Sequence, residues 1–189
     1  MALGVGPAAL DVWEAMADEA AAESPLWGAA LRPDDEREAL PVFSPLGPPA
    51  LALGLETIYE GYLVHYGRPR LFAPPDRDTA VLLGDYLYAH GLVRVAERGE
   101  VAVVADLAEL LSLCAQLRAE SAPGDADDDG VLWAATFALV GSGDPELVAA
   151  RSALRDAGDP SPLASLAVRA AGADPVAGAL ALHRARLAV

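Results

Sequence analysis

The sequence predicts an all-α, single-domain helical bundle, and two observations support that fold class. The 189 residues are 53% hydrophobic but only 6% aromatic, and alanine, leucine and valine dominate. Alanine and leucine are strong helix formers, whereas strands prefer β-branched and aromatic residues. The apolar residues also recur three or four positions apart over long segments, which is the helical period. A chain of this length can bury one sizeable core, so we expect one domain over residues 1–189.

The N-terminal part predicts one helix followed by a proline-rich connector. Pro7–Glu23 has apolar residues on one face and acidic residues mostly on the other, so it predicts an amphipathic helix that Pro25 ends. Residues 27–40 predict a short helix or loop, because Pro33 precedes three acidic residues that favour a helix N-terminus. The four prolines within residues 41–49 predict a connector.

Three longer helices are predicted in the middle of the chain. Residues 50–66 carry apolar side chains at helical spacing, and the glycine and proline that follow end the helix. The next helix runs to about residue 97, with Asp78 and Thr79 as its predicted cap. Few charges interrupt it, so it is the predicted central helix. Residues 101–120 predict a further amphipathic helix.

The C-terminal segment, residues 144–189, has residues typical of helix starts and ends at regular spacing. Three Asp-Pro pairs recur 15 residues apart, each with a glycine shortly before it, at Asp144-Pro145, Asp159-Pro160 and Asp174-Pro175. Glycine is typical of helix C-termini, aspartate of N-caps and proline of the first helical turn. The pattern predicts three short packed helices.

The charge balance excludes several functions. The chain has 13 basic and 28 acidic residues, a net charge of −15, and every basic residue is an arginine. Such a field repels nucleic-acid backbones and anionic membrane surfaces, so we expect no nucleic-acid partner. With no lysine, the chain has no Schiff-base former and no lysine anchor for phosphate.

Three further features predict a soluble cytoplasmic protein. The N-terminus lacks the basic region of a secretory signal and becomes acidic within its first helix. The longest uncharged run contains four prolines, so we expect no membrane span. The single Cys114 cannot form an internal disulfide, which is typical of a reducing compartment, and its place on an apolar helical face predicts core packing.

Two short motifs stand at a matched separation in the middle of the chain. Gly67-Arg68-Pro69 is followed, after a proline-broken loop, by the Gly84–Leu87 sequence GDYL, and Leu63-Val64-His65 with Glu56 precedes both. This arrangement resembles the trans-isoprenyl (polyprenyl) diphosphate synthase family. The later GSGDPELV sequence is similar to a turn of that family, so the resemblance covers about residues 51–148.

The resemblance implies a shortened isoprenoid synthase fold and an incomplete catalytic site. Synthases of this family hold Mg²⁺ between two aspartate-rich motifs, and the metal neutralises the departing diphosphate. Here Tyr66 alone lies between His65 and Gly67, where the family has its first aspartate-rich motif and a pair of arginines. The second motif is not recognisable either. We therefore expect no prenyl transfer by this chain alone.

The family's motif residues match three positions that could touch a ligand: Arg68, Asp85 and Tyr86. Arg68 can bind a phosphate or a carboxylate through two parallel hydrogen bonds. A structural alternative is that Arg68 ends a helix and pairs with Asp76, Asp78 or Asp85. For Asp85 we favour a structural hydrogen bond within the bundle.

A second candidate site lies in the acidic segment before residue 130. Asp125, Asp127, Asp129 and Gly130 match the first half of an EF-hand calcium loop, but Thr136 stands where that loop has its bidentate glutamate. The segment therefore predicts either a weak cation site or, as the commoner alternative, a solvated acidic loop.

The leading functional hypothesis is a polyprenyl-synthetase-like protein of isoprenoid metabolism without prenyl transfer of its own. It would act as a non-catalytic subunit beside a catalytic synthase, or as a pseudoenzyme that binds a prenyl diphosphate or forms a homodimer. No cofactor is expected. The enzyme alternative is a divergent Mg²⁺-dependent prenyltransferase that takes its carboxylates from residues 125–129. The third alternative is an acidic helical protein-interaction module.

Overall fold

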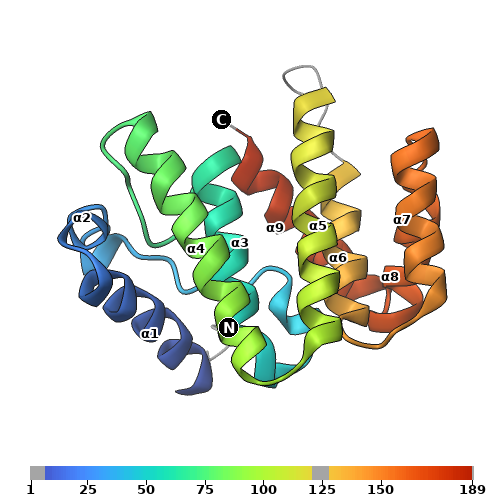
Figure 1. Ribbon diagram of the computed structural model, residues 1–189, viewed down its shortest axis with the longest axis horizontal. Helices are drawn as coiled ribbons and strands as arrows, with labels where there is room; N and C mark the ends of the chain where they lie inside the picture. The colour runs from blue at the N-terminus through green and yellow to red at the C-terminus, as the bar shows by residue number, and fades with distance from the viewer. Residues whose placement is uncertain (1–6, 121–127, 189) are drawn as a thin grey trace. The chain divides into compact units, whose positions relative to one another are not determined.

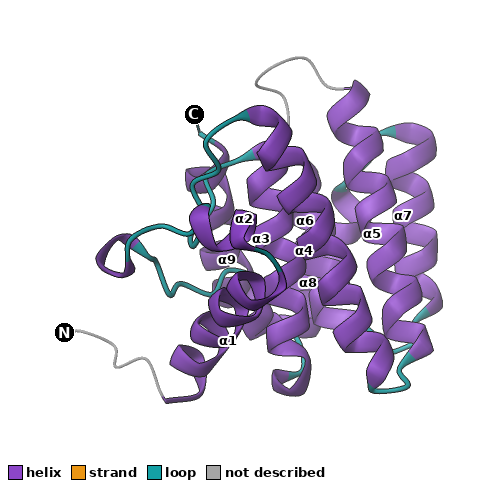
Figure 2. Cartoon of the chain, turned by 60° about the vertical axis from the view of Figure 1, so that its left-hand side comes forward, coloured by secondary structure: helices purple, strands orange, loops and turns teal. Residues whose placement is uncertain are grey.

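The computed structural model describes residues 7–120 and 128–188, and every α-helix or 3-10 helix in Figure 1 belongs to these two ranges. Within them the regular structure is helical, as Figure 2 shows, apart from one antiparallel bridge between Leu31 and Phe72. The predicted all-α fold class is therefore confirmed for the described part of the chain.

The helices follow the predicted order closely. They are α1 (Pro7–Glu23), α2 (Pro25–Ala29), α3 (Ala52–Tyr66), α4 (Arg77–Glu97), α5 (Val101–Glu120), α6 (Asp128–Leu139), α7 (Pro145–Ala157), α8 (Ser161–Ala171) and α9 (Ala173–Leu187). Three short 3-10 helices, Asp34–Glu36, Ser44–Leu46 and Pro49–Leu51, lie in the connectors. Pro25 separates α1 from α2 by occupying the first turn of α2, where a proline is tolerated because its missing N–H would have had no helical partner.

The predicted cap of α4 is wrong by two residues. The helix begins at Arg77, and the carboxylate of Asp76 accepts a 2.7 Å hydrogen bond from the backbone N–H of Thr79. Asp76 is therefore the N-cap, because its side chain satisfies a free donor of the first helical turn.

The described chain divides into two compact units. Unit 1 contains the described parts of Met1–Pro41, Ala52–Val93 and Arg186–Val189. Its core is formed by apolar side chains of α1, α3, α4 and the connecting segments: Trp13, Met16, Ala20, Ala30, Val64, Leu71, Phe72, Leu83 and Leu87. Unit 2 contains Val42–Leu51 and Arg94–Ala185.

Within unit 1, α3 is more deeply buried than α4. All eleven residues from Gly54 to Val64 are buried, whereas α4, the predicted central helix, exposes Val81, Leu82 and Val93 to solvent. The helices α3 and α4 approach closely at glycines. A Cβ atom on Gly91 would lie 2.5 Å from Ile58 Cγ1 and 2.9 Å from the carbonyl oxygen of Gly54. A side chain there would push the two backbones apart.

In unit 2, α6 is the most buried helix. It contacts α5, α7 and α8, and its Trp133 and Phe137 are fully buried against Phe43 of the proline-rich connector. The connector therefore supplies an aromatic side chain to the core of unit 2.

The three predicted C-terminal helices are present as α7, α8 and α9. Asp144 and Asp159 accept hydrogen bonds from the backbone N–H groups of Glu146 and Ser161, at 2.8 and 3.0 Å. Gly158 ends α7 with a positive φ of 63°, as expected for a glycine C-cap. The second and third aspartates differ from the predicted N-caps, because Pro160 is the N-cap of α8 and Asp174 lies inside α9. None of the described helices combines the length and apolar character needed to cross a membrane.

Candidate functional site

The GRP sequence forms a turn between α3 and an extended segment. The backbone N–H of Gly67 donates to Leu63 and closes the last turn of α3. The backbone N–H of Arg68 donates a 2.9 Å hydrogen bond to the carbonyl oxygen of Arg186. A Cβ atom at Gly67 would lie 2.9 Å from that same carbonyl oxygen. The glycine of this motif therefore permits close packing against the chain's last helical turn.

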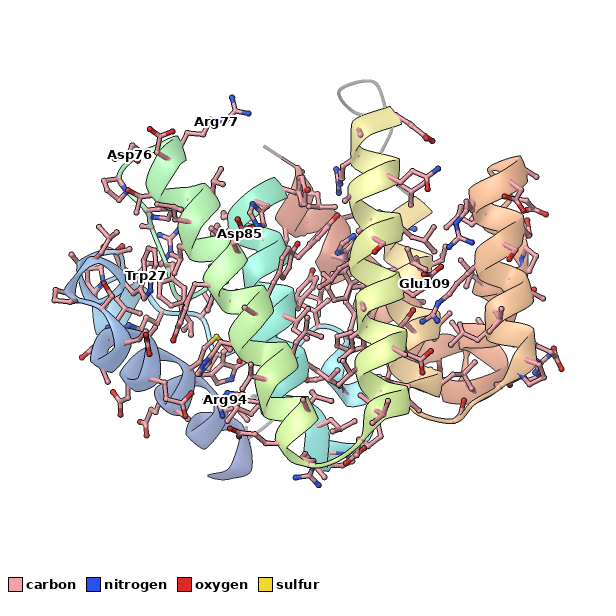
Figure 3. The ribbon with its side chains drawn as sticks, in the orientation of Figure 1. Trp27, Asp76, Arg77, Asp85, Arg94 and Glu109 are labelled. Carbon is pink, nitrogen blue, oxygen red and sulfur yellow. The ribbon has the colours of Figure 1, made fainter. Side chains whose placement is uncertain are left out.

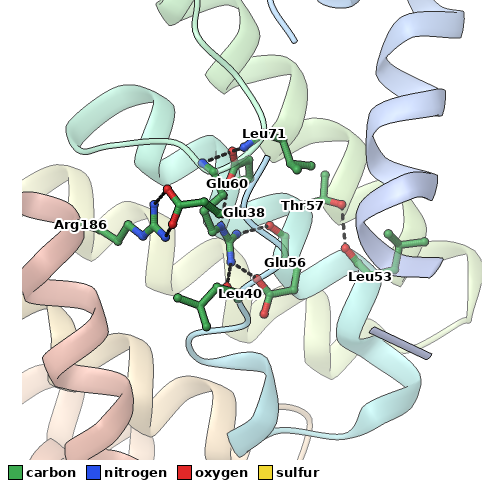
Figure 4. A network of polar contacts seen from close by, with 9 residues as sticks. Glu38, Leu40, Leu53, Glu56, Thr57, Glu60, Leu71 and Arg186 are labelled. Carbon is green, nitrogen blue, oxygen red and sulfur yellow. Dashed lines mark hydrogen bonds and ion pairs between the residues drawn. The ribbon is translucent and has the colours of Figure 1, made fainter. Parts of the chain in front are cut away.

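Immediately after the motif, Arg70 is fully buried among charged side chains, and Figure 4 shows its partners Glu56 and Glu60 from close by. Its Nη1 donates 2.6 Å and 2.9 Å hydrogen bonds to Glu56 and to the carbonyl oxygen of Leu40. Its Nε donates to Glu60 at 2.8 Å. The other oxygen of Glu60 accepts from the backbone N–H groups of Arg70 and Leu71, both at 2.7 Å. We call Arg70, Glu56 and Glu60 the Arg70 centre.

Two aromatic rings complete the surroundings of this guanidinium. It lies 4.5 Å from the ring centre of Trp13 and 5.1 Å from that of Tyr59. Burial alone would lower the pKa of Arg70, but the charges of Glu56 and Glu60 outweigh it and raise the pKa above its ordinary value. The arginine therefore stays charged, and the Arg70 centre fixes α3 against the segments on either side of it.

Arg68, the predicted ligand-binding arginine, is exposed and lies beside a second ion pair. Arg186 is only 3% exposed, and both of its terminal nitrogens donate to the carboxylate of Glu38. The hydrogen bond from Arg186 lowers the pKa of Glu38, and the charges of Arg186, Arg68 and Arg32 lower it further. We call these four residues the Glu38 cluster.

Asp85, in the GDYL motif, pairs with a histidine of α3. His65 Nε2 lies 3.2 Å from Asp85 Oδ1, and the His65 ring packs onto Gly84, where a Cβ atom would lie 2.4 Å from it. Burial lowers the pKa of His65, although the charge of Asp85 opposes the shift. The side chain of Asp85 is mostly exposed (Figure 3).

Tyr86 has different neighbours from Asp85. Its ring stacks on Trp27 at 5.6 Å between ring centres and on His90 at 5.3 Å. Burial raises the pKa of its hydroxyl group. Each of the three motif residues thus contacts a different set of side chains.

Of the three aspartates of the predicted cation site, the structure describes one. Asp125 and Asp127 lie outside the described residues. Asp129 is 1% exposed on α6, so it is not part of a solvated loop. Its carboxylate lies 2.6 Å from Arg118 Nη2 and 3.1 Å from His183 Nε2. We call Asp129, Arg118 and His183 the Asp129 centre.

Cys114 lies in the core, as the sequence predicts. Burial raises the pKa of its thiol well above the ordinary value, and the nearby charge of Asp129 raises it further. The thiol therefore stays protonated, which makes it a poor nucleophile.

The described residues do not fit the Mg²⁺ cluster that the family resemblance implies. In residues 7–120 and 128–188, no group of three histidine, cysteine, aspartate or glutamate side chains is arranged to hold a metal ion. The buried carboxylates there have cationic partners instead, since Glu56 and Glu60 bind Arg70 and Asp129 binds Arg118.

Four residues with well defined polar contacts were not predicted from the sequence, namely Glu60, Arg70, Glu38 and Arg186. One signal was available: Glu56 and Glu60 are four residues apart, so they lie on one face of a helix. Two acidic side chains on a mostly apolar helix indicate a buried cation nearby. No comparable local pattern connects Glu38 with Arg186, because the two are 148 residues apart.

Comparison with known proteins adds no family assignment. Neither the protein-family models, nor the curated proteins, nor the solved structures contain a match to this chain. The resemblance carried by the GRP and GDYL motifs therefore stays a prediction, and function must be argued from the geometry.

Proposed function

We propose that this chain is a polyprenyl-synthetase-like protein of isoprenoid metabolism that acts in the cytoplasm as a non-catalytic partner of a prenyl diphosphate synthase. The observation that carries the proposal is the Arg70 centre. It joins the helix and the extended segment on either side of the GRP turn through fully buried charges. The two segments that flank the GRP turn therefore form a structural core of the protein.

The chemistry of prenyl transfer supports the same conclusion. Carboxylates that hold Mg²⁺ must point their oxygens at the metal and keep room for water and diphosphate. Both oxygens of Glu60 accept hydrogen bonds from the protein, and Glu56 faces the same guanidinium. Freeing either one would leave Arg70 short of a counter-charge inside the protein, which is unfavourable.

The outer face of α4 offers a surface for the partner. Leu82 is 58% exposed and Val93 52% exposed, with Val81 beside them on the same helix. These three are the large apolar residues of α4 that are exposed, and a contiguous exposed apolar patch is typical of a surface that binds another protein. Asp85 adds a negative charge to this face, which favours a partner with basic residues at the border of its own apolar surface.

The test combines an assay with a matched pair of variants. The purified protein is incubated with Mg²⁺, isopentenyl diphosphate and allylic diphosphates of several lengths, alone and with a catalytic synthase from the same cell. We expect no product from the chain alone and an altered product length in the mixture. Leu82→Asp should abolish the effect, whereas Val148→Asp, which changes an exposed valine on α7, should preserve it.

Each other outcome contradicts the proposal in a different way. Turnover by the isolated chain would favour the divergent Mg²⁺-dependent prenyltransferase. A stable complex through the α4 face without any change in product would favour the acidic interaction module. Loss of the effect in both variants would show that the α4 face is not the contact surface.

A further inference from the structure

We propose that a pocket beside α1, the dark blue helix of Figure 1, binds a linear aliphatic diamine, a methylene chain with an ammonium group at each end. The pocket has a volume of about 450 Å³ and lies between α1, residues 34–39 and Leu71, all of them in unit 1. We call it the α1 pocket. The inference goes beyond the proposed function, because it needs neither a synthase partner nor the α4 face.

The inner surface of the α1 pocket is apolar. Trp13, Ala17 and Leu71 are buried there, and Ala39 is half-buried. Trp13 and Leu71 also belong to the core of unit 1, and the ring centre of Trp13 lies 4.5 Å from the guanidinium of Arg70. The core therefore holds this surface in place. A methylene chain can lose its contact with water by packing on it.

On the α1 side, two acidic side chains border the pocket. Glu14 and Asp18 are exposed and four residues apart, so they lie on one face of the helix. Two like charges at this spacing destabilise a helix, and the sequence of α1 contains no basic residue that could offset them. An ammonium group bound beside them would relieve this repulsion.

On the opposite side, the pocket is bordered by Asp34 and Arg37. Arg37 Nη1 lies 2.7 Å from Asp34 Oδ1, and Arg37 Nε donates a 2.9 Å hydrogen bond to the carbonyl oxygen of Arg32. The backbone N–H of Arg32 donates in turn to the carbonyl oxygen of Leu71 at 2.8 Å. These bonds fix the wall before any ligand binds, which lowers the cost of binding. The side chain of Asp34 is still 89% exposed, so it can accept a second cation.

The charges of the lining favour a cation with two charged ends. Three carboxylates and one guanidinium border the pocket, and they stand on two walls with apolar side chains between them. A diamine places one ammonium group at each wall and its methylene chain on the apolar surface, whereas a monoamine satisfies one wall only. A metal ion needs oxygens that converge on one point, and the described residues have no such group.

Isothermal titration with putrescine tests the pocket at low and constant ionic strength, where the attraction of exposed charges is least screened. The proteins are the wild type, Asp18→Asn, Asp34→Asn and Glu23→Gln. Glu23 is the exposed last residue of α1 and does not line the pocket, so its variant removes the same charge from the same helix. Butylamine, which has the same carbon chain and a single ammonium group, is the second ligand.

We expect Asp18→Asn and Asp34→Asn each to bind putrescine roughly fivefold more weakly than the wild type, because each variant loses one exposed ion pair with the ligand. Glu23→Gln should bind like the wild type, and butylamine should bind the wild type roughly fivefold more weakly than putrescine does.

Three results would overturn the proposal. Absence of putrescine binding to the wild type at millimolar concentration would show that the pocket takes no diamine. An equal loss of affinity in all three variants would indicate counter-ion binding to an acidic chain. Equal affinities for butylamine and putrescine would show that the pocket binds a single ammonium group, such as that of a lysine side chain. None of these results bears on the synthase assay, because the substituted residues lie outside α4.

Discussion

The two units contain buried charge centres of opposite composition. In unit 1, one arginine lies between two glutamates, and all three side chains are almost fully inaccessible. In unit 2, one aspartate lies between an arginine and a histidine, and the side chain of Arg118 keeps 17% of its surface in solvent. The Arg70 centre has one arginine for two carboxylates, whereas the Asp129 centre has an arginine and a histidine for one carboxylate.

This difference decides how each centre responds to change. Arginine does not lose its proton in proteins, so the Arg70 centre has a fixed composition. Losing Arg70 would leave two carboxylates buried together. In the Asp129 centre, Arg118 is partly hydrated and His183 is a second partner of the carboxylate, so this centre tolerates the loss of its arginine better.

The most damaging change is expected at Arg70. Arg70→Met keeps much of the side-chain volume but leaves Glu56 and Glu60 without their cation, so the free energy of unfolding should fall by about 3–5 kcal/mol. Urea denaturation measures the loss. Arg77→Met, at an exposed arginine, should change stability by less than about 0.5 kcal/mol. A loss at Arg70 no larger than at Arg77 would show that the centre is not a structural core.

A smaller loss is expected at Asp129. Asp129→Asn removes the charge that Arg118 and His183 share, so the free energy of unfolding should fall by about 2 kcal/mol, less than for Arg70 because Arg118 can reach water. Millimolar Ca²⁺ should leave the melting temperature of the wild type unchanged, since both oxygens of Asp129 already have protein partners. Stabilisation of the wild type by Ca²⁺ that Asp129→Asn abolishes would restore the calcium-loop hypothesis.

Backbone packing can be separated from charge in unit 1 with a pair of glycine variants. Gly91→Ala forces a methyl group against Ile58 and the Gly54 carbonyl oxygen, which should cost about 1–3 kcal/mol. Gly178→Ala, in α9, meets no atom within 4 Å and should stabilise the protein by about 0.5–1 kcal/mol. Thermal unfolding measures both. Equal effects of the two substitutions would contradict the close approach of α3 and α4.

Interactions between residues close in the sequence were predictable, whereas those between distant residues were not. The start of α7 was predictable at Asp144, because a cap acts within three residues of its own position. The pairing of Glu38 with Arg186 was not predictable, since it depends on a tertiary arrangement that local patterns do not encode. The glycines of the GRP and GDYL motifs were only partly predictable. Gly67 and Gly84 were recognised as parts of motifs, but their structural role became clear only from the atoms that a side chain would meet.

The smallest expected effect concerns His65, the histidine that packs on the GDYL motif. Burial holds its pKa below the ordinary value of 6.5, so the unfolded chain binds more protons than the folded one once the pH falls below about 6.5. The stability that depends on a neutral His65 is therefore complete above that pH. It is lost as the pH falls toward the pKa of His65 in the folded protein.

When the pH is lowered from about 7.5 to about 5, the free energy of unfolding should therefore decrease less for His65→Gln than for the wild type. Asp85→Asn should have the opposite effect, because the charge of Asp85 opposes the lowering of the His65 pKa. Removing that charge lowers the pKa further and enlarges the loss in acid. Denaturant titrations of the three proteins at both pH values measure these differences. If the two variants shift the pH dependence in the same direction, His65 and Asp85 do not act as the pair that joins α3 to α4.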